Sequence, residues 1–186
     1  AKVGLENLQD LLFHLPLRYQ DRTRVVPIGQ LRPGQDAVIE GVVSGADVTM
    51  GKRRSLVVRL GDGTGVLSLR FYHFSNAQKE GLKRGTHVRC YGEARPGASG
   101  LEIYHPEYRA LNGDEPATPV EQTLTPIYPT TEGLTQQRLR LLCQQSLGQL
   151  GPRSLPDWLP DELARDYRLA PLSDAIRYLH NPPADA

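Results

Sequence analysis

The clearest binding chemistry in the sequence lies in an aromatic and basic stretch near its middle, Arg70-Phe-Tyr72-His-Phe74. Residues two apart in a strand share a face, so Arg70 and Tyr72 are expected to present a cation and a flat ring side by side. Bases stack on such rings because every base has a π face, and each stacked base contributes about 1–3 kcal/mol. The stretch therefore indicates a surface for single-stranded or unpaired bases.

Each of these aromatic residues also has a purely structural interpretation. Tyr72 could cover the outer surface of a small β-barrel, and Phe74 could pack beneath the short helix expected after it. Phe71 points to the opposite face from Tyr72 and is expected in the core. Both interpretations stay open at the level of the sequence.

Further basic residues could supply the phosphate contacts of such a surface. Phosphate neutralisation by lysine and arginine is independent of base sequence and weakens with added salt. The candidates lie at an expected hairpin tip, on a later strand and in the loop after that strand: Lys52, Arg53, Arg54, Arg89 and Arg95. For the triplet at the tip, a solvated turn without any contact is an equally good interpretation.

Motifs for catalysis or metal binding are absent from the sequence. Between Gly45 and Lys52, five residues separate the two glycines where a phosphate-binding loop needs four, and arginine follows the lysine in place of serine or threonine. The five histidines are scattered, and no Cys-x-x-Cys, His-x-x-x-His or Gly-x-Ser-x-Gly motif occurs. We therefore expect this chain alone not to be an enzyme, with no catalytic residue, metal ligand or cofactor.

Charge is spread unevenly along the chain, although the formal net charge is only +1. Residues 33–112 contain 11 Lys and Arg against 8 Asp and Glu, whereas the remainder has a net charge of −2. This mild excess favours an anionic partner for the middle segment. Cys90 and Cys143 are expected to be buried free thiols, and no apolar run is long enough to span a membrane.

The elements that position these residues follow an all-β pattern with one helix. Alternating apolar residues predict strands around 38–43, 56–60, 67–71, 88–92 and 101–103. Ser75 and Gln78 form a capping-box pattern for a short helix, with Leu82 as its anchor and Gly85 as its end. Strand, strand, strand, helix, strand, strand predicts a five-stranded Greek-key OB-fold barrel over residues 33–112.

Helical segments are expected on both sides of the barrel, which makes the fold class mainly β with flanking helices. Residues 1–32 hold a leucine-rich amphipathic helix and then a charged surface loop, LRYQDRT. Residues 113–133 form a Pro/Thr-rich extended linker with prolines at 116, 119, 126 and 129. Residues 134–186 form a helix from Leu134 to Leu150, stopped by Gly151-Pro152, and two shorter helices, 160–167 and 173–181.

Five stretches in this order closely resemble the N-terminal part of bacterial RecG helicases: LQDLLFHLPLRYQDRT, IGQLRPGQDAVIEGVV, LGDGTGVLSLRFYHF, YGEARPGASGLEIYHPEY and LTPIYPTTEGLTQQRLR. The resemblance implies a wedge domain at the branch point of stalled replication forks and Holliday junctions. In that family the motor pulls the DNA arms against the wedge, which splits the strands during fork reversal, DNA repair and recombination. The motor, with its ATP and Mg²⁺, would lie beyond Ala186, and we expect the chain to begin inside the family's first helical region.

By position, Tyr72 matches the first aromatic residue of the family pattern Phe-Asn-Gln-x-Tyr. The second aromatic residue would fall on Asn76, which cannot stack in the same way, so Phe74 is the candidate replacement. The resemblance further implies branched DNA, helicase motor domains in cis and single-stranded-DNA-binding protein as partners. It also implies a monomer in the bacterial cytoplasm, associated with the nucleoid. The alternative is a protein-interaction OB module without intrinsic DNA affinity.

Overall fold

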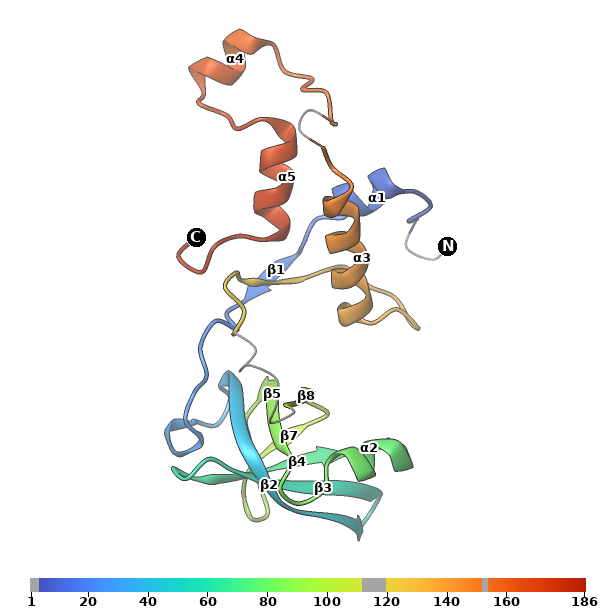
Figure 1. Cartoon of the computed structure of the whole chain (residues 1–186), viewed down its shortest axis with the longest axis vertical. Helices are drawn as coiled ribbons and strands as arrows, with labels where there is room; N and C mark the ends of the chain where they lie inside the picture. The colour runs from blue at the N-terminus through green and yellow to red at the C-terminus, as the bar shows by residue number, and fades with distance from the viewer. Residues whose placement is uncertain (1–3, 112–119, 152–153) are drawn as a thin grey trace. The chain divides into compact units, whose positions relative to one another are not determined.

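The computed structural model describes residues 4–111, 120–151 and 154–186. The chain forms two compact units (Figure 1). One unit is continuous in sequence, and the other combines the two ends of the chain: Arg22–Glu121, and Ala1–Asp21 with Gln122–Ala186. The finer division into 1–32, 33–112, 113–133 and 134–186 stays a prediction.

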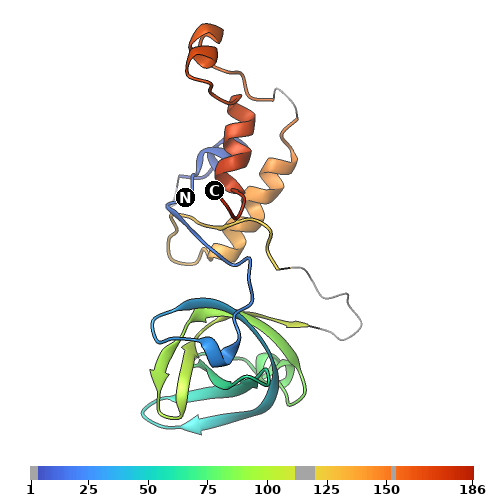
Figure 2. The same ribbon diagram turned by 90° about the vertical axis from the view of Figure 1, so that its left-hand side faces the viewer.

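The continuous unit is built on a single sheet that curls into a barrel (Figure 2). In the described part of the chain this sheet has seven strands, in the order β6-β7-β4-β3-β2-β5-β8. The strands are β2 (Asp36–Met50), β3 (Arg54–Gly61), β4 (Val66–Phe71), β5 (His87–Glu93), β6 (Arg95–Gly97), β7 (Gly100–Tyr104) and β8 (Glu107–Leu111). Neighbours are antiparallel except β4 and β7, which run parallel.

The connectivity confirms the predicted OB fold. Helix α2 (Asn76–Gly81) follows the third barrel strand, the first barrel strand β2 pairs with both β3 and β5, and the parallel β4–β7 pair brings the last main strand next to the third. Two details differ from the expectation. The segment Arg95–Gly100, expected as a glycine-rich loop, contains the short strand β6 in a hairpin with β7, and β8 extends the sheet beyond β5.

The predicted inward faces form the barrel core. Side chains from β3 and β4 are at most 3% exposed: Leu56, Val58, Leu60, Leu67, Leu69 and Phe71. At the start of α2, the Ser75 hydroxyl accepts a hydrogen bond from the Gln78 amide at 3.1 Å, which is the Ser75 half of the predicted capping box. Leu82 anchors the helix end with no exposed surface, and Gly85, with a φ of 89°, lies in the turn before β5 instead of ending the helix.

Strand β2 bends where its glycines predict a bend. The register of its pairing with β3 shifts between Val43 and Gly45. At Gly41 a Cβ atom would lie 2.7 Å from the carbonyl oxygen of Gly61, so that a side chain would force the two strands apart. Bulges and glycines of this kind allow one long strand to serve both sides of a small barrel.

The unit formed by the chain ends is mainly helical. Its helices are α1 (Leu8–Phe13), α3 (Gln136–Gly148), α4 (Asp161–Asp166) and α5 (Leu172–His180). Helix α3 matches the predicted long helix, and α4 and α5 match the two shorter ones. Apolar side chains from both ends of the sequence meet in its core: Leu12, Tyr128, Leu139, Cys143, Leu147, Leu150 and Ile176.

Two segments of this unit correct the sequence-based expectation. The expected surface loop contains strand β1 (Arg18–Gln20), and the expected linker contains strand β9 (Thr125–Ile127). The two strands pair antiparallel, with Arg18 opposite Ile127. Proline can occupy a two-stranded ribbon because one edge needs no ladder hydrogen bond, and burial of Thr125 and Tyr128 holds this segment in place. The prolines at 116, 119 and 152 lie outside the described residues.

Cys90 and Cys143 are both buried free thiols, as predicted. No helix among the described residues has the length and apolar character needed to cross a bilayer. In the same residues, no group of three or more His, Cys, Asp or Glu side chains could hold a metal ion.

Candidate nucleic-acid interface

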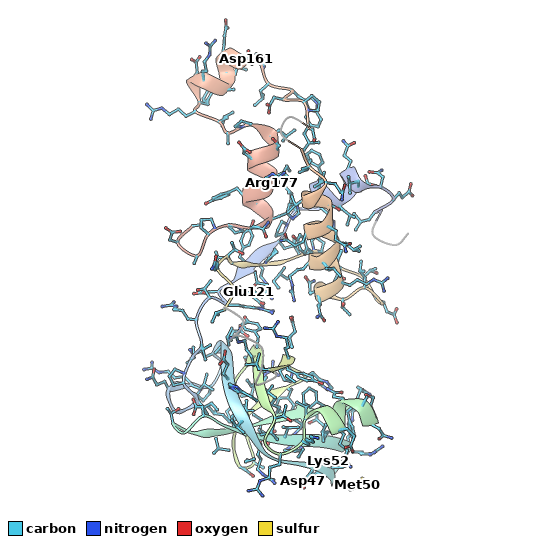
Figure 3. The ribbon with its side chains drawn as sticks, in the orientation of Figure 1. Asp47, Met50, Lys52, Glu121, Asp161 and Arg177 are labelled. Carbon is cyan, nitrogen blue, oxygen red and sulfur yellow. The ribbon has the colours of Figure 1, made fainter. Side chains whose placement is uncertain are left out.

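Four of the predicted binding residues line one hollow on the outer surface of the barrel. The hollow has a volume of about 590 Å³ and lies between the β2–β3 hairpin tip and the end of β4. Figure 3 labels Met50 and Lys52 at this tip. The walls of the hollow are formed by Thr49, Met50, Gly51, Lys52, Arg53, Ser55, Arg70 and Tyr72. An open hollow with cations on one wall and a ring on another can receive a phosphate and a base together.

The sequence places these side chains through the register of β3 and β4. Val57 lies opposite Arg70, and Leu56 lies opposite Phe71. Since Leu56 and Phe71 both point into the core, Arg70 and its neighbours two residues away point outward. The turn between β2 and β3 then carries Lys52 and Arg53 into solvent.

Tyr72 directly follows β4 and belongs to a cluster of rings. Its ring stacks on that of Tyr104, with centroids 6.0 Å apart and an interplanar angle of 17°. The ring of His105 is 5.7 Å away, and its Nε2 accepts a hydrogen bond from the Tyr72 amide at 3.3 Å. These contacts hold the Tyr72 ring in one place. The side chain is also partly exposed, and both properties suit a ring that stacks on a base.

Phe74 has a different environment. It is partly buried and packs against the barrel core. The guanidinium carbon of Arg54 lies 4.9 Å from the centroid of its ring, within the range of a cation–π interaction. The structure thus gives Phe74 a packing role and gives Arg54 a partner within the protein.

Three of the predicted cations are paired with carboxylates. Arg70 binds Glu102 through two nitrogens, at 2.8 and 2.9 Å. This hydrogen-bonded pairing raises the pKa of Arg70 and lowers that of Glu102, although desolvation opposes both shifts. Arg89 pairs with Glu40 on β2, and Arg95 pairs with Glu93 on β5 at 2.8 Å.

Lys52 and Arg53 differ from these arginines. Both side chains are exposed, and neither makes a hydrogen bond or ion pair with another residue that the structure describes. Their charges are therefore fully available to an anion. Of the predicted contacts, Lys52 and Arg53 are exposed and share a hollow with the partly exposed ring of Tyr72.

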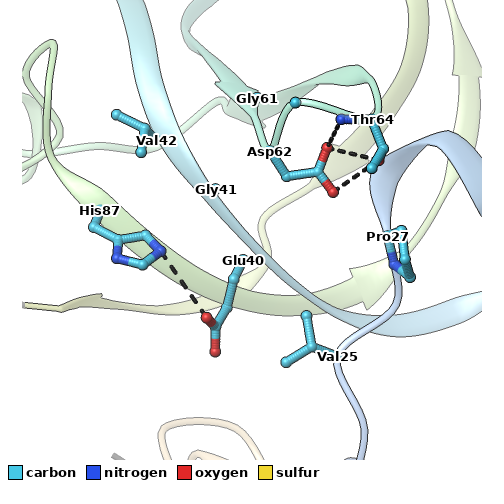
Figure 4. A pocket seen from close by; sticks show the side chains of 10 residues that line it. Val25, Pro27, Glu40, Gly41, Val42, Gly61, Asp62, Thr64 and His87 are labelled. Atoms are coloured by element: carbon cyan, nitrogen blue, oxygen red, sulfur yellow. Dashed lines mark hydrogen bonds and ion pairs between the residues drawn. The ribbon is translucent and has the colours of Figure 1, made fainter. Parts of the chain in front are cut away.

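A second hollow, on another part of the barrel, has the opposite character (Figure 4). Its volume is about 510 Å³, and its lining includes Glu40, Asp62 and His87. Desolvation raises the pKa of Asp62, but hydrogen bonds from Ile28, Thr64 and Gly65 outweigh it and lower the pKa to about 2. Two carboxylates make this hollow a poor site for phosphate.

Sequence reasoning did not include Tyr104 and Glu102 among the site residues. The alternation in β7 places Ile103 in the core and Tyr104 on the opposite face, and this alternation is visible in the sequence. The proximity of Tyr104 to Tyr72 depends on the parallel β4–β7 pairing, which sets Tyr104 opposite Arg70. Knowing that these two strands are neighbours in an OB fold would have been enough to place Tyr104 near Tyr72.

The comparisons with known proteins agree with one another. The family model described as RecG wedge domain matches residues 1–150. ATP-dependent DNA helicase RecG of Escherichia coli (strain K12) is 46% identical over 183 residues, which cover 98% of this chain and 26% of that protein. The same helicase of Pasteurella multocida (strain Pm70) is 46% identical over 185 residues, which cover 100% of this chain and 26% of that protein.

A solved structure of RecG bound to a three-way DNA junction matches this chain with a TM-score of 0.77 and 25% sequence identity. The match covers 98% of this chain and 25% of that one. The chain thus spans about a quarter of the length of these relatives. The resemblance deduced from the sequence is confirmed.

Proposed function

The chain belongs to the RecG wedge domain family, and from this premise we propose that it binds branched DNA and splits its strands at the branch point. The proposed substrates are stalled replication forks and Holliday junctions, during fork reversal, repair and recombination. The relative whose structure has been solved is bound to a three-way DNA junction. The wedge acts passively, because the chemistry of its surface provides binding without catalysis.

The observation that carries this proposal is the hollow beside the β2–β3 hairpin tip. Lys52 and Arg53 provide unpaired positive charge, and Tyr72 provides a fixed ring within the same hollow. Cations in this position neutralise backbone phosphates, while the ring stacks on the last base pair before the branch. Strand separation then follows because the ring replaces the next base pair in the stack.

The other predicted binding residues have a smaller part in this proposal. Arg54 and Phe74 are partners of each other, Arg89 is paired with Glu40, and Arg95 is paired with Glu93. Contact with DNA would require these side chains to leave their partners. We assign the primary contacts to Lys52, Arg53 and Tyr72.

For the whole protein, we propose an ATP-dependent helicase motor with Mg²⁺ in cis, since both relatives are ATP-dependent DNA helicases and are about four times as long as this chain. The motor moves the DNA, and the wedge determines where the strands part. The proposed setting is the bacterial cytoplasm at the nucleoid, with a monomeric protein and single-stranded-DNA-binding protein as a further partner.

The test is a titration of the purified chain against a three-way fork, a matched duplex and a single strand, at two salt concentrations. We expect tighter binding to the fork and weaker binding at the higher salt. Tyr72→Ala should weaken fork binding by about 5- to 150-fold, the effect of losing one stacked base. Tyr167→Ala changes another exposed tyrosine, in the unit formed by the chain ends, and should have no effect.

The charge contribution has its own matched pair of variants. Lys52→Gln with Arg53→Gln should reduce the slope of log affinity against log salt by about 0.9 for each phosphate that the variant no longer neutralises. Lys83→Gln with Arg84→Gln removes an equivalent exposed pair before β5 and should leave the slope unchanged. Equal affinity for fork and duplex would refute branch recognition by this chain, and no binding at low salt would favour the protein-interaction module.

A further inference from the structure

We propose that Arg70 and Glu102 are positioning residues, which hold the ring of Tyr104 against Tyr72 and thereby fix the surface that stacks on DNA. In this assignment Arg70 does not neutralise a phosphate, although it lines the hollow. The proposal rests on the branched-DNA function and specifies how its site is built.

The parallel pairing of β4 and β7 brings the participants together. Ser68 lies opposite Glu102, and Arg70 lies opposite Tyr104. Leu69 and Ile103, between them, point into the core with no exposed surface. The side chains of Arg70, Glu102 and Tyr104 therefore share the outer face of two adjacent strands.

Glu102 is the buried anchor of this group, with an exposure of 3%. Gly97 on β6 leaves the space that it occupies, because a Cβ atom there would lie 2.2 Å from the Glu102 Cγ. A buried carboxylate is stable only when it is paired and hydrogen-bonded. Arg70 meets this need with two parallel hydrogen bonds of 2.8 and 2.9 Å.

The donors of Arg70 are largely committed to the protein. Its Nε and Nη2 bind Glu102, and its Nη1 donates to the Ser55 hydroxyl at 2.9 Å. Ser55 is itself buried and hydrogen-bonded to the Thr49 hydroxyl at 2.9 Å. The ion pair has no net charge, so a phosphate gains little by approaching it.

Tyr104 connects this anchor to the stacking ring. Burial raises the pKa of the Tyr104 hydroxyl, and the nearby Glu102 carboxylate raises it further, while the Tyr104 ring lies 6.0 Å from that of Tyr72 at 17°. The Tyr104 hydroxyl thus lies under the influence of a buried carboxylate, and the Tyr104 ring supports the partly exposed ring of Tyr72. A ring that is already immobilised loses less conformational entropy when a base stacks on it.

The first test measures the position of Tyr72 without DNA. In aromatic NMR spectra of the chain, Tyr104→Leu should shift the ring signals of Tyr72, because the ring current of its neighbour disappears. Tyr104→Phe keeps the ring but loses the hydroxyl that faces Glu102, so it should restore only part of the wild-type shift. Arg70→Gln with Glu102→Gln should also shift the Tyr72 signals, because Tyr104 loses its support, and unchanged Tyr72 signals in this double variant would overturn the proposal, whatever the chain binds.

The second test uses the salt dependence of fork binding. Tyr104→Leu should weaken binding by about 2- to 10-fold with an unchanged salt slope, and Tyr104→Phe should have a smaller effect. Arg70→Gln with Glu102→Gln removes both charges without leaving either one buried alone, and should also leave the salt slope unchanged. A slope reduced by about 0.9 in this double variant would assign Arg70 to a phosphate and refute the proposal.

The positioning role and the branched-DNA function fail in different ways. If the wild-type chain does not prefer forks, the proposed function fails while the NMR result on Tyr72 still stands. If the wild-type chain prefers forks but the Tyr104 variants match it in affinity, only the positioning role fails.

Discussion

His180 is a fully buried residue at the end of α5, in the unit formed by the chain ends. Its Nε2 lies 2.8 Å from the carbonyl oxygen of Leu12, and its Nδ1 lies 2.7 Å from the Tyr128 hydroxyl. A carbonyl oxygen can only accept, so Nε2 carries the hydrogen and Nδ1 accepts from Tyr128. Burial favours this neutral imidazole over the charged form.

We predict that the stability of this unit falls as the pH drops below about 6.5. Burial lowers the pKa of His180 below its ordinary value of 6.5, with a further decrease from His14, although the bond to Leu12 opposes both. The unfolded chain therefore takes up a proton at higher pH than the folded chain. The contribution of His180 to stability is complete above pH 6.5 and is lost as the pH falls through the lowered pKa.

The measurement is chemical denaturation at several pH values between 7.5 and 5, followed by helical circular dichroism. His180→Gln should be less stable than wild type at pH 7.5 by about 1–3 kcal/mol, because the buried partners lose their hydrogen bonds. Its stability should also depend less on pH. His73→Gln, at an exposed histidine, is the control. An equally steep pH dependence in His180→Gln would contradict this explanation.

At the scale of elements, the turn between β3 and β4 fixes the start of a short helix that lies earlier in the chain. Asp62 accepts hydrogen bonds from the amides of Thr64 and Gly65 within the turn, at 2.8 and 3.1 Å. It also accepts from the amide of Ile28, at 2.8 Å, which begins the short helix η1 (Ile28–Gln30). One carboxylate thus ties the chain entering the barrel to a hairpin turn 34 residues later.

We predict that Asp62→Ala destabilises the barrel by about 1–2 kcal/mol at neutral pH, a value reduced for the solvent exposure of the turn. The pKa of Asp62, lowered to about 2 from 3.8, means that its contribution is complete above pH 4 and is lost as the pH falls through 2. Denaturation at pH 7 and pH 2.5 should show the difference between variant and wild type shrinking in acid.

Asp47→Ala provides the matched control. Asp47 forms an exposed ion pair with Arg59 at 2.7 Å, with side-chain exposures of 59% and 50%. Exposed pairs of this kind contribute between zero and about 1 kcal/mol. If Asp62→Ala cost no more than Asp47→Ala, the hydrogen bonds of the turn would have no special role.

Strands and helices whose apolar residues repeat at a regular spacing could be predicted from the sequence. Contacts that depend on the pairing of strands far apart in the chain could not. Alternation identified Leu67, Leu69 and Phe71 as core, because a strand with one buried face leaves this pattern. Strand β1 is only three residues long, and its partner β9 contains proline and lies more than 100 residues away. Neither strand has enough residues to show a period, and their pairing depends on the packed helices around them.

The candidate site shows the same limit. The outward direction of Tyr72 could be predicted because its neighbours in sequence define its face, while its role in binding stays a prediction. The pairing of Arg70 with Glu102 joins residues 32 apart, so the sequence alone could not show that this predicted phosphate contact has a partner within the protein. Residue type indicated which side chains can bind DNA, whereas the fold determines which of them are free to do so.

At the scale of the whole molecule, each unit has its own core. Every core residue of the barrel unit lies between Val26 and Tyr108. The core of the other unit combines Leu12 near the start of the chain with Leu147 and Ile176 near its end. The segment up to Asp21 therefore belongs to the helical unit, and none of its described residues, 4–21, is a member of the barrel core.

We predict that deletion of residues 1–21 unfolds the helical unit and leaves the barrel folded. The deletion removes Leu12 from the core, the partner strand of β9 and the carbonyl that His180 binds. Amide hydrogen exchange should show weakened protection in α3 and α5, with protection in β2–β5 unchanged. A milder variant, Leu12→Ala, should cost the helical unit about 2–5 kcal/mol through the cavity it creates.

Leu8→Ala is the matched control, because Leu8 lies on the same helix as Leu12 but is 47% exposed, against 2% for Leu12. Its cost should be well below that of Leu12→Ala, since little apolar surface is removed from the core. Weakened protection in the barrel strands after the deletion would show that the two units fold as one. Intact protection in α3 and α5 would show instead that the N-terminal segment is dispensable, since the remaining helices would then be stable without Leu12.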